Sequence, residues 1–344
     1  MPRALIAAAL LAACTAADRP APAPSSAPGP VPPAMSPAPP AAAPAEPVPA
    51  DTPPAAAAPL ERHTVPATDG HPLAVHARRP ADPWAAIVLV HGRTWSALPD
   101  FDLQVPGAGV SLLETLAAAG LAAYAVDLRG YGATPRDPTG FATPAQAAAD
   151  LAAVLRFVAA QPGPKTRPAV LGWSLGARVA ALTAQRHPDL AGPLVLYGTP
   201  CSDPNRRRAT PPRDPTTPAR RTNTEASARA DFITPDAIDP AVADAFVRAA
   251  LAADPIKADW RDAAAWSAID FRALAAPILA IHGERDPVVD ADCLRKRLAE
   301  ARGPTAIEVL PGADHAAHLE RVAPRFAAAV VAFLARHVRK DIPD

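Results

Sequence analysis

A serine lies at the centre of the pattern Gly-Trp-Ser-Leu-Gly over residues 172–176, between an apolar run at 169–171 and a helical stretch over 175–186. The two glycines let the chain turn sharply from a strand into a helix, which leaves the serine hydroxyl exposed at the carboxyl end of the strand. Such a serine becomes a nucleophile when a base accepts its proton and a carboxylate orients the base. The pattern therefore predicts Ser174 as the nucleophile of covalent catalysis.

Two loops further along the chain hold a carboxylate and a histidine in the order that this chemistry needs. Asp286 follows the apolar run 278–281, and His315 follows the run 307–310. The histidine would accept the serine proton, and the carboxylate would hold the imidazole in the correct orientation. We therefore expect Asp286 to be the acid and His315 to be the base.

Three nearby residues offer rival assignments. His318 lies close behind His315 and is a second candidate base, although we interpret it as a surface helix residue. Glu284 and Asp314 are rival acids, and we interpret both as solvated loop carboxylates.

The elements that must position these residues alternate between strand and helix. We expect strands over 71–79, 86–90, 121–126, 169–171, 194–197, 278–281 and 307–310, and helices over 111–119, 144–160, 175–186, 291–301 and 323–338. Such alternation is typical of a mainly parallel sheet covered by helices on both faces. The three candidate residues then lie at one edge of the sheet, because each of them follows the carboxyl end of a strand.

Residues 61–338 resemble the serine hydrolases of the α/β-hydrolase fold. The resemblance includes His91-Gly92 after the strand 86–90 and the segment Asp-Leu-Arg-Gly-Tyr-Gly over 127–132 after the strand 121–126. It also includes the serine turn and both downstream loops. It implies an α/β-hydrolase fold, with Ser174 as nucleophile, His315 as base and Asp286 as acid.

The same resemblance implies that the backbone N–H groups of Arg93 and Leu175 stabilise the oxyanion of the reaction. Haloalkane dehalogenases and epoxide hydrolases of this fold are excluded, because they have aspartate where this chain has Ser174. The sequence contains no Cys/His spacing typical of zinc and no glycine-rich phosphate loop. We therefore expect no cofactor and no metal.

The stretch from about 198 to 269 interrupts the alternation where folds of this kind insert a cap over the active site. An aminopeptidase would need carboxylates directed from this cap toward the substrate amine, whereas we interpret the cap aspartates between 236 and 259 as an exposed helix face. The expected function is therefore hydrolysis of a small-molecule carboxylic ester through an acyl-enzyme. The alternatives are a serine peptidase of the prolyl aminopeptidase type and a catalytically silent binding protein.

The N-terminus resembles a bacterial lipoprotein signal peptide over residues 1–13. Arg3 precedes the apolar run 4–13, and small residues lead to Cys14. That run is too short to span a bilayer as a helix. The resemblance implies that Cys14 carries lipid and anchors the protein to a membrane of the bacterial cell envelope, with Thr15 favouring the outer membrane. The alternative is an ordinary secretory signal in which the cysteine is incidental. Residues 14–60 form a tether expected to be disordered, since residues 1–60 hold 17 of the 46 prolines. Residues 61–344 form the hydrolase domain.

Charge and cysteine content limit the remaining partners. The 34 basic and 34 acidic residues give a net charge of zero, which argues against nucleic acid as a partner. The sequence does not indicate an oligomeric state. Once Cys14 is lipidated, Cys201 and Cys293 remain as an even pair in an oxidising compartment. We expect either a disulfide between them, tying the root of the cap to the region of Asp286, or two separately buried thiols.

Overall fold

The computed structural model describes residues 58–201, 214–234 and 236–338. The chain divides into two units, Met1–Thr52 and Pro53–Asp344, and the description below concerns the second. The predicted signal peptide, Cys14 and nearly all of the predicted tether lie outside the described residues.

An eight-stranded sheet forms the centre of this unit. Its spatial order is β1-β2-β4-β3-β6-β7-β9-β10. The first two strands, β1 (Leu60–Pro66) and β2 (Pro72–Arg78), form an antiparallel hairpin, and β2 pairs antiparallel with β4. The others run parallel: β3 (Ala85–Val90), β4 (Leu121–Val126), β6 (Ala169–Trp173), β7 (Leu194–Tyr197), β9 (Ile278–Gly283) and β10 (Thr305–Leu310). The predicted mainly parallel sheet is confirmed.

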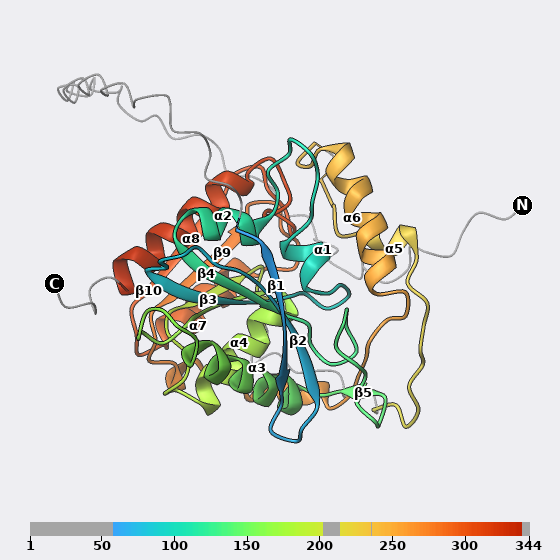
Figure 1. The fold of residues 1–344 in the computed structure, drawn as a ribbon, viewed down its shortest axis with the longest axis horizontal. Coiled ribbons are helices and arrows are strands. Elements are labelled where there is room, and N and C mark those ends of the chain that lie inside the picture. Colours follow the sequence, from blue (N-terminus) through green and yellow to red (C-terminus); the bar gives the residue numbers. More distant parts are fainter. Residues whose placement is uncertain (1–57, 202–213, 235, 339–344) are drawn as a thin grey trace, which may run out of the picture. The chain divides into compact units, whose positions relative to one another are not determined.

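Helices cover both faces of the sheet (Figure 1). On one face pack α3 (Pro144–Ala159), α4 (Leu175–Arg186) and α7 (Ala291–Ala299). On the other pack α1 (Ala97–Phe101), α2 (Leu112–Ala118) and α8 (Ala323–Val338). Alternate residues of one strand serve the two faces, as Val88 and Val90 point to the first core and Ile87 and Leu89 to the second. Because both faces are covered, the central strands read as continuous apolar runs.

The segment between β7 and β9 contains the predicted cap, which we call the cap segment (residues 198–269). Its described elements are α5 (Glu225–Arg229), α6 (Pro240–Ala253), β8 (Asp259–Trp260) and the 3-10 helix η1 (Ala263–Ala268), and a second 3-10 helix, η2 (Phe271–Ala273), follows it. A two-residue strand of the body, β5 (Phe141–Ala142), pairs with β8. Ile238 and Phe246 are buried in a cluster that also includes Trp95 and Leu319 of the body, and Leu251 is partly buried against it. The cap segment therefore shares a core with the body.

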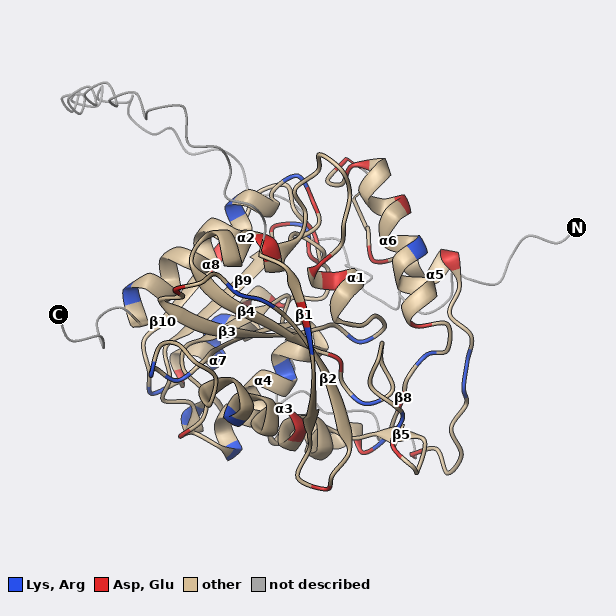
Figure 2. Cartoon of the chain, viewed as in Figure 1, with Lys and Arg blue, Asp and Glu red and all other residues tan. Residues whose placement is uncertain are grey.

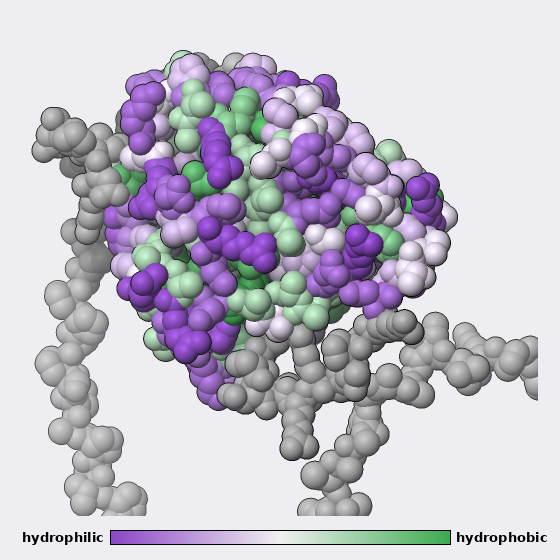
Figure 3. Space-filling view, turned by 90° about the horizontal axis from the view of Figure 1, so that it is seen from below, coloured by the Kyte–Doolittle hydropathy of each residue, from purple (hydrophilic) through white to green (hydrophobic). Residues whose placement is uncertain are grey.

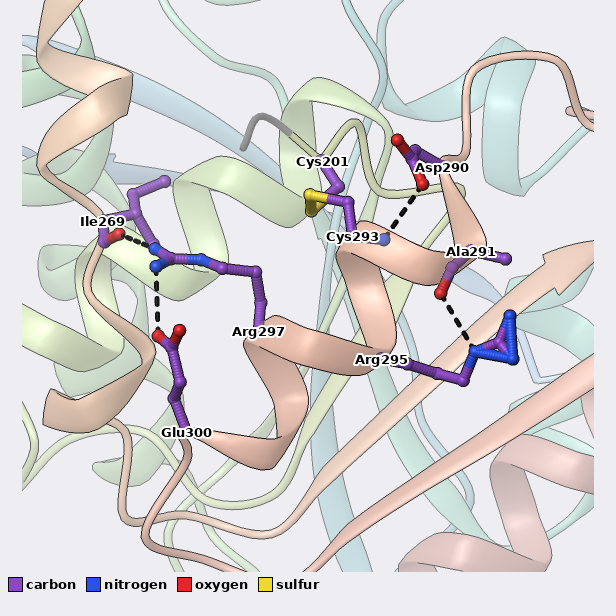
Figure 4. The surroundings of a disulfide bond; sticks show 8 residues. All are labelled: Cys201, Ile269, Asp290, Ala291, Cys293, Arg295, Arg297 and Glu300. Atoms are coloured by element: carbon purple, nitrogen blue, oxygen red, sulfur yellow. Dashed lines mark hydrogen bonds and ion pairs between the residues drawn. A yellow bond between two sulfur atoms is a disulfide. The ribbon is translucent and has the colours of Figure 1, made fainter. Parts of the chain in front are cut away.

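Helix α7 holds the cap segment near both of its ends (Figure 4). Cys293 on α7 forms a disulfide with Cys201, just after β7, so the expected pair is bonded in the structure. One turn further along α7, the Arg297 guanidinium donates a hydrogen bond to the carbonyl oxygen of Ile269 at 2.5 Å. Helix α7 thus ties the root of the cap segment to the body through a disulfide and a hydrogen bond.

The surface of the described residues is mixed in character. Figure 2 shows Lys and Arg positions interspersed with Asp and Glu positions along the chain, in keeping with the zero net charge. On the face shown in Figure 3, hydrophobic residues are scattered between hydrophilic ones. None of the helices in the described residues combines the length and the hydropathy needed to span a bilayer.

Candidate active site

Ser174 occupies a strained turn between β6 and α4. Its φ of 53° lies in the left-handed region, which residues with a side chain seldom adopt. The two flanking glycines make this turn feasible. A Cβ on Gly172 would overlap the carbonyl oxygen of Gly176, and a Cβ on Gly176 would overlap the carbonyl oxygen of Val90 at the end of β3. The close approach of three backbone segments therefore holds the serine at the carboxyl edge of the sheet.

His315 and Asp286 meet at the same edge. The imidazole Nδ1 lies 2.8 Å from the Asp286 Oδ2, and the side chains are 10% and 0% exposed. The other oxygen of Asp286 accepts the backbone N–H of Val288 at 2.9 Å. Because a carboxylate accepts at Nδ1, this nitrogen carries the proton and Nε2 is left as the proton acceptor. The pair has the geometry of an oriented general base.

Two aromatic side chains hydrogen-bond to the backbone of His315. The Trp173 indole N–H and the Tyr197 hydroxyl both donate to the His315 carbonyl oxygen, at 2.9 and 2.8 Å. Gly198, with φ of 55°, follows Tyr197. A Cβ there would lie 3.0 Å from the His315 Cε1 and 3.3 Å from the Asp286 Oδ2. Sequence reasoning missed Tyr197 and Gly198, whose only signal is their place at the end of a buried strand.

One pocket brings Ser174 and His315 together. Its lining consists of Gly92, Arg93, Thr94, Trp95, Trp173, Ser174, Asp231 and His315. Arg93, one of the two predicted oxyanion donors, is therefore in the lining. Leu175, the other, begins α4 directly after Ser174. The helix N-terminus favours negative charge beside its free N–H groups.

The segment 91–96, which we call the 91–96 loop, is fixed by buried groups of the body. The Nε2 of His91 accepts the Leu128 N–H at 3.0 Å, and burial lowers the pKa of this imidazole. Asp100 is fully buried and accepts the Gly92 N–H at 3.2 Å, and burial raises its pKa well above the ordinary value. The Tyr131 hydroxyl donates to the carbonyl oxygen of Arg93. The loop backbone is thus positioned before substrate binds.

A carboxylate of the cap segment also holds this loop. Asp254, at the end of α6, accepts the N–H of Ser96 and the N–H of Gly132, each at 2.8 Å. Asp254 is only 4% exposed, and burial raises its pKa. The interpretation of the cap aspartates as an exposed helix face is therefore wrong for Asp254, although Asp239 and Asp244 are exposed. Helical spacing did not reveal this, because Asp254 lies where α6 ends and the chain turns back to the body.

A second cap carboxylate lies in the pocket itself. Asp231 follows α5 and accepts a hydrogen bond from the Trp95 indole N–H at 2.6 Å. Burial raises the pKa of Asp231, while the proximity of His315 favours its ionised form. This residue lies outside the run of aspartates considered from the sequence, and no local pattern marked it. The expectation of a cap without a carboxylate directed into the pocket is therefore wrong.

The rival assignments are separated by their surroundings. His318 is buried, not a surface residue, and its Nδ1 lies 3.1 Å from the Tyr197 hydroxyl. Burial lowers its pKa to about 3. Asp314 is also buried, whereas Glu284 is exposed and accepts the Gly312 N–H. The solvent-exposed interpretation is thus wrong for His318 and Asp314, and the carboxylate on the His315 ring belongs to Asp286.

Comparisons with known proteins agree with this architecture. The sequence model of the family described as serine aminopeptidase, S33, matches residues 81–322. A putative aryl esterase from Burkholderia cenocepacia is similar in structure, with 20% identity, TM-score 0.58, and 81% of this chain and 100% of that chain covered. The proline iminopeptidase of Mycobacterium smegmatis gives 20% identity, TM-score 0.56 and coverage of 82% and 100%. A bacterial membrane phospholipase A gives 18% identity, TM-score 0.56 and coverage of 81% and 87%. No curated protein sequence matches significantly.

These likenesses, together with the mainly parallel sheet and its two helical layers, show the α/β-hydrolase fold that the sequence predicts.

Proposed function

The chain belongs to the serine aminopeptidase S33 family of hydrolases, and from this premise we propose that it cleaves carboxylic esters through an acyl-enzyme formed on Ser174. The observation that carries the proposal is the hydrogen bond between His315 and Asp286 in the pocket that Ser174 lines. An oriented imidazole in the same pocket as a half-buried serine is the arrangement that acyl transfer needs.

The reaction follows from the roles of these groups. As the Ser174 hydroxyl attacks the ester carbonyl, its proton passes to the Nε2 of His315, and Asp286 stabilises the imidazolium. The oxyanion of the tetrahedral intermediate accepts the N–H groups of Arg93 and Leu175. His315 then donates the proton to the leaving alcohol. Water repeats the sequence to release the acid.

Removal of the nucleophile tests the proposal. Ser174→Ala and His315→Ala should each lower kcat for p-nitrophenyl acetate by about 10³-fold or more, because the base and nucleophile act as one unit. Ser267→Ala, a serine exposed on η1, is the matched control and should keep full activity. Circular dichroism checks that each variant is folded. Turnover of Ser174→Ala near that of the wild type would refute the assignment, and labelling of wild type by a fluorophosphonate separates an enzyme from a silent binding protein.

The second candidate is an aminopeptidase, and Asp231 is the observation that favours it. Esterases and peptidases share this fold, so the pocket has to separate them. A substrate ammonium left unpaired in a closed pocket would be costly, and the Asp231 carboxylate lies where it could pair with that charge. Asp231 already accepts a hydrogen bond from the Trp95 indole N–H, and burial raises its pKa. The carboxyl group is therefore less strongly held in the ionised form that an ammonium would need. We therefore retain the ester as the preferred substrate.

Substrate pairs decide between the two. We expect prolyl p-nitroanilide to be hydrolysed at least about a hundredfold more slowly than short p-nitrophenyl esters, a gap of about 2.7 kcal/mol in transition-state stabilisation. Asp231→Asn should leave kcat/KM for p-nitrophenyl acetate within about threefold of wild type, a difference below about 0.7 kcal/mol. Comparable kcat/KM on both classes, with a selective loss of the amine-bearing substrate in Asp231→Asn, would favour the aminopeptidase.

We further propose that the protein is held at a membrane of the bacterial cell envelope through lipid on Cys14. The support is the signal-like sequence of residues 1–13 followed by a proline-rich stretch. Such an arrangement presents the hydrolase domain to small-molecule substrates near the lipid surface. Two or more acyl chains would make the anchoring firm.

A further inference from the structure

Two carboxyl groups are buried together beside the base and take no part in the chemistry described above. Asp314 directly precedes His315 and is 0% exposed, and Glu320 is 3% exposed. The Asp314 N–H donates to both carboxylate oxygens of Glu320, at 3.3 and 3.1 Å, so the two buried carboxyl groups lie close to each other. Two ionised carboxylates in contact without solvent repel strongly, so such a pair holds one shared proton.

The pair also connects the loop of the base to the cap segment. The Oδ2 of Asp314 accepts the backbone N–H of Thr234, in the cap segment, at 2.5 Å. On the other side of the pair, the N–H of Arg321 donates to the carbonyl oxygen of Ala237 at 2.8 Å. The stretch that contains His315 is therefore hydrogen-bonded to the cap segment at both of its ends, to Thr234 through the Asp314 carboxylate and to Ala237 through the Arg321 N–H.

We propose that Asp314 and Glu320 form a clamp that positions His315 against the cap segment, closed while the pair holds one proton and loosened when that proton leaves. Glu320 is the positioning residue, because its protonated carboxyl group donates to Asp314 and leaves the outer Asp314 oxygen to accept the Thr234 N–H. The loss of the proton places a second negative charge beside Asp314. The two side chains then separate, and the backbone preceding His315 moves with them.

The ionisation that opens the clamp is that of Glu320. Burial, followed by the hydrogen bond and the charge of Asp314, raises the pKa of Glu320 to about 8, while hydrogen bonds from Glu320 and backbone N–H groups lower the pKa of Asp314. The clamp is thus closed below about pH 8 and opens above it. Besides burial, the charges of Glu320, Asp286 and Asp314 raise the pKa of the Tyr197 hydroxyl on β7. His315 and His318 lie in the same stretch as the pair, Asp231 of the cap segment acts on His315, and the Arg321 guanidinium donates to the carbonyl oxygen of Asp236.

The pH dependence of turnover tests the role of Glu320. Between about pH 7.5 and about pH 9.5, kcat of the wild type for p-nitrophenyl acetate should fall at least about fivefold, with KM within about twofold. Glu320→Gln should lose less than about twofold over the same range, because its amide N–H donates to Asp314 at every pH. Glu308→Gln, which removes a carboxylate paired with Arg325 at the surface, is the matched control and should keep the wild-type profile. A wild-type alkaline fall that persists in Glu320→Gln would overturn the proposal.

The inference rests on the proposed role of His315, so a second measurement follows the clamp without turnover. In the Ser174→Ala chain, hydrogen exchange of the Thr234 amide should accelerate at least about tenfold, beyond the intrinsic effect of pH, between about pH 7.5 and about pH 9.5. Adding Glu320→Gln, or Asp314→Asn if the former does not fold, should abolish this acceleration. Unchanged protection in the Ser174→Ala chain refutes the clamp even if the proposed function holds. If exchange of the Thr234 amide accelerates with pH but kcat of the wild type does not change, the clamp opens without affecting His315. That result would refute the proposed positioning of the base.

Discussion

Loss of the Cys201–Cys293 disulfide should destabilise the protein by an amount set mainly by the length of chain that it closes. The two cysteines are 92 residues apart. A cross-link over a loop of this length removes about 16 cal/mol/K of entropy from the unfolded chain, which is about 4.6 kcal/mol at room temperature. Arg297 still ties α7 to Ile269 in the folded state, so native contacts near the cap root survive and the loss lies chiefly in the unfolded state.

Urea denaturation measures this effect. The background is Cys14→Ser, which leaves Cys201 and Cys293 as the remaining cysteines of the chain. Adding Cys201→Ala and Cys293→Ala should lower the free energy of unfolding by about 3–5 kcal/mol. Reduction of the parent with dithiothreitol should give the same value as the double alanine variant, which serves as the control for lost sulfur packing.

Two results would refute this reasoning. The first is a loss below about 1 kcal/mol, which would mean that the loop entropy is not the dominant contribution. The second is the titration of two free thiols in the denatured, unreduced parent, which would mean that the cysteines are separately buried. Ester turnover in native buffer should change little in either state, because the cap segment keeps its polar tie to α7.

Three other changes have defined outcomes. Gly176→Ala places a Cβ against the Val90 carbonyl oxygen and should lower the free energy of unfolding by about 3 kcal/mol or more, as measured in a thermal melt. A melting temperature equal to that of the wild type would contradict the close approach of Gly176 to β3. Arg129→Met leaves three carboxylates without their cation and should cost about 3–5 kcal/mol at neutral pH. Because Arg129 lowers the pKa of Asp69 from 3.8 to about 2, the stability that the ionised Asp69 contributes in the wild type is present above pH 3.8 and lost as the pH falls toward 2. Acid unfolding at the same pH in the wild type and Arg129→Met would refute this contribution. Cys14→Ser should move the protein from the membrane fraction to the soluble fraction with unchanged turnover, and retention in the membrane would exclude the lipid anchor.

The parts of the site set by local geometry could be predicted from the sequence. The Gly-Trp-Ser-Leu-Gly turn identified Ser174 because a sharp strand-to-helix turn requires small residues on both sides. Asp286 and His315 followed because parallel strands bring their carboxyl ends to one edge, and the structure places both side chains there. The central strands were equally accessible, since burial on both faces produces apolar runs that are visible without any knowledge of their neighbours. Strand β1, which is largely unburied, was not expected from the sequence.

The contributions of tertiary contacts could not be predicted in this way. Asp231 and Asp254 follow helices of the cap segment, at positions where spacing says nothing about which way the chain turns. In the sequence, His318 looks like a surface helix residue and Asp314 like a solvated loop carboxylate. Their burial becomes apparent only in the structure, where His318 packs against Trp173 and Tyr197 and Asp314 lies beside Glu320. Polar side chains are usually exposed, so an interior position becomes apparent only when the hydrogen-bonding partners are known.

Two carboxylates of the cap segment bind the 91–96 loop, and they restrict how such an enzyme could diversify. If specificity were changed by exchanging the cap, the structure of the catalytic body would ideally stay the same. Here Asp254 accepts the Ser96 N–H and Asp231 accepts the Trp95 indole N–H. A transplanted cap that lacks these aspartates would therefore remove two hydrogen bonds that hold the 91–96 loop. Chimeras that keep both aspartates should therefore tolerate new cap helices, and libraries aimed at new substrates are better built on the residues between these two anchors than by replacing the whole insertion.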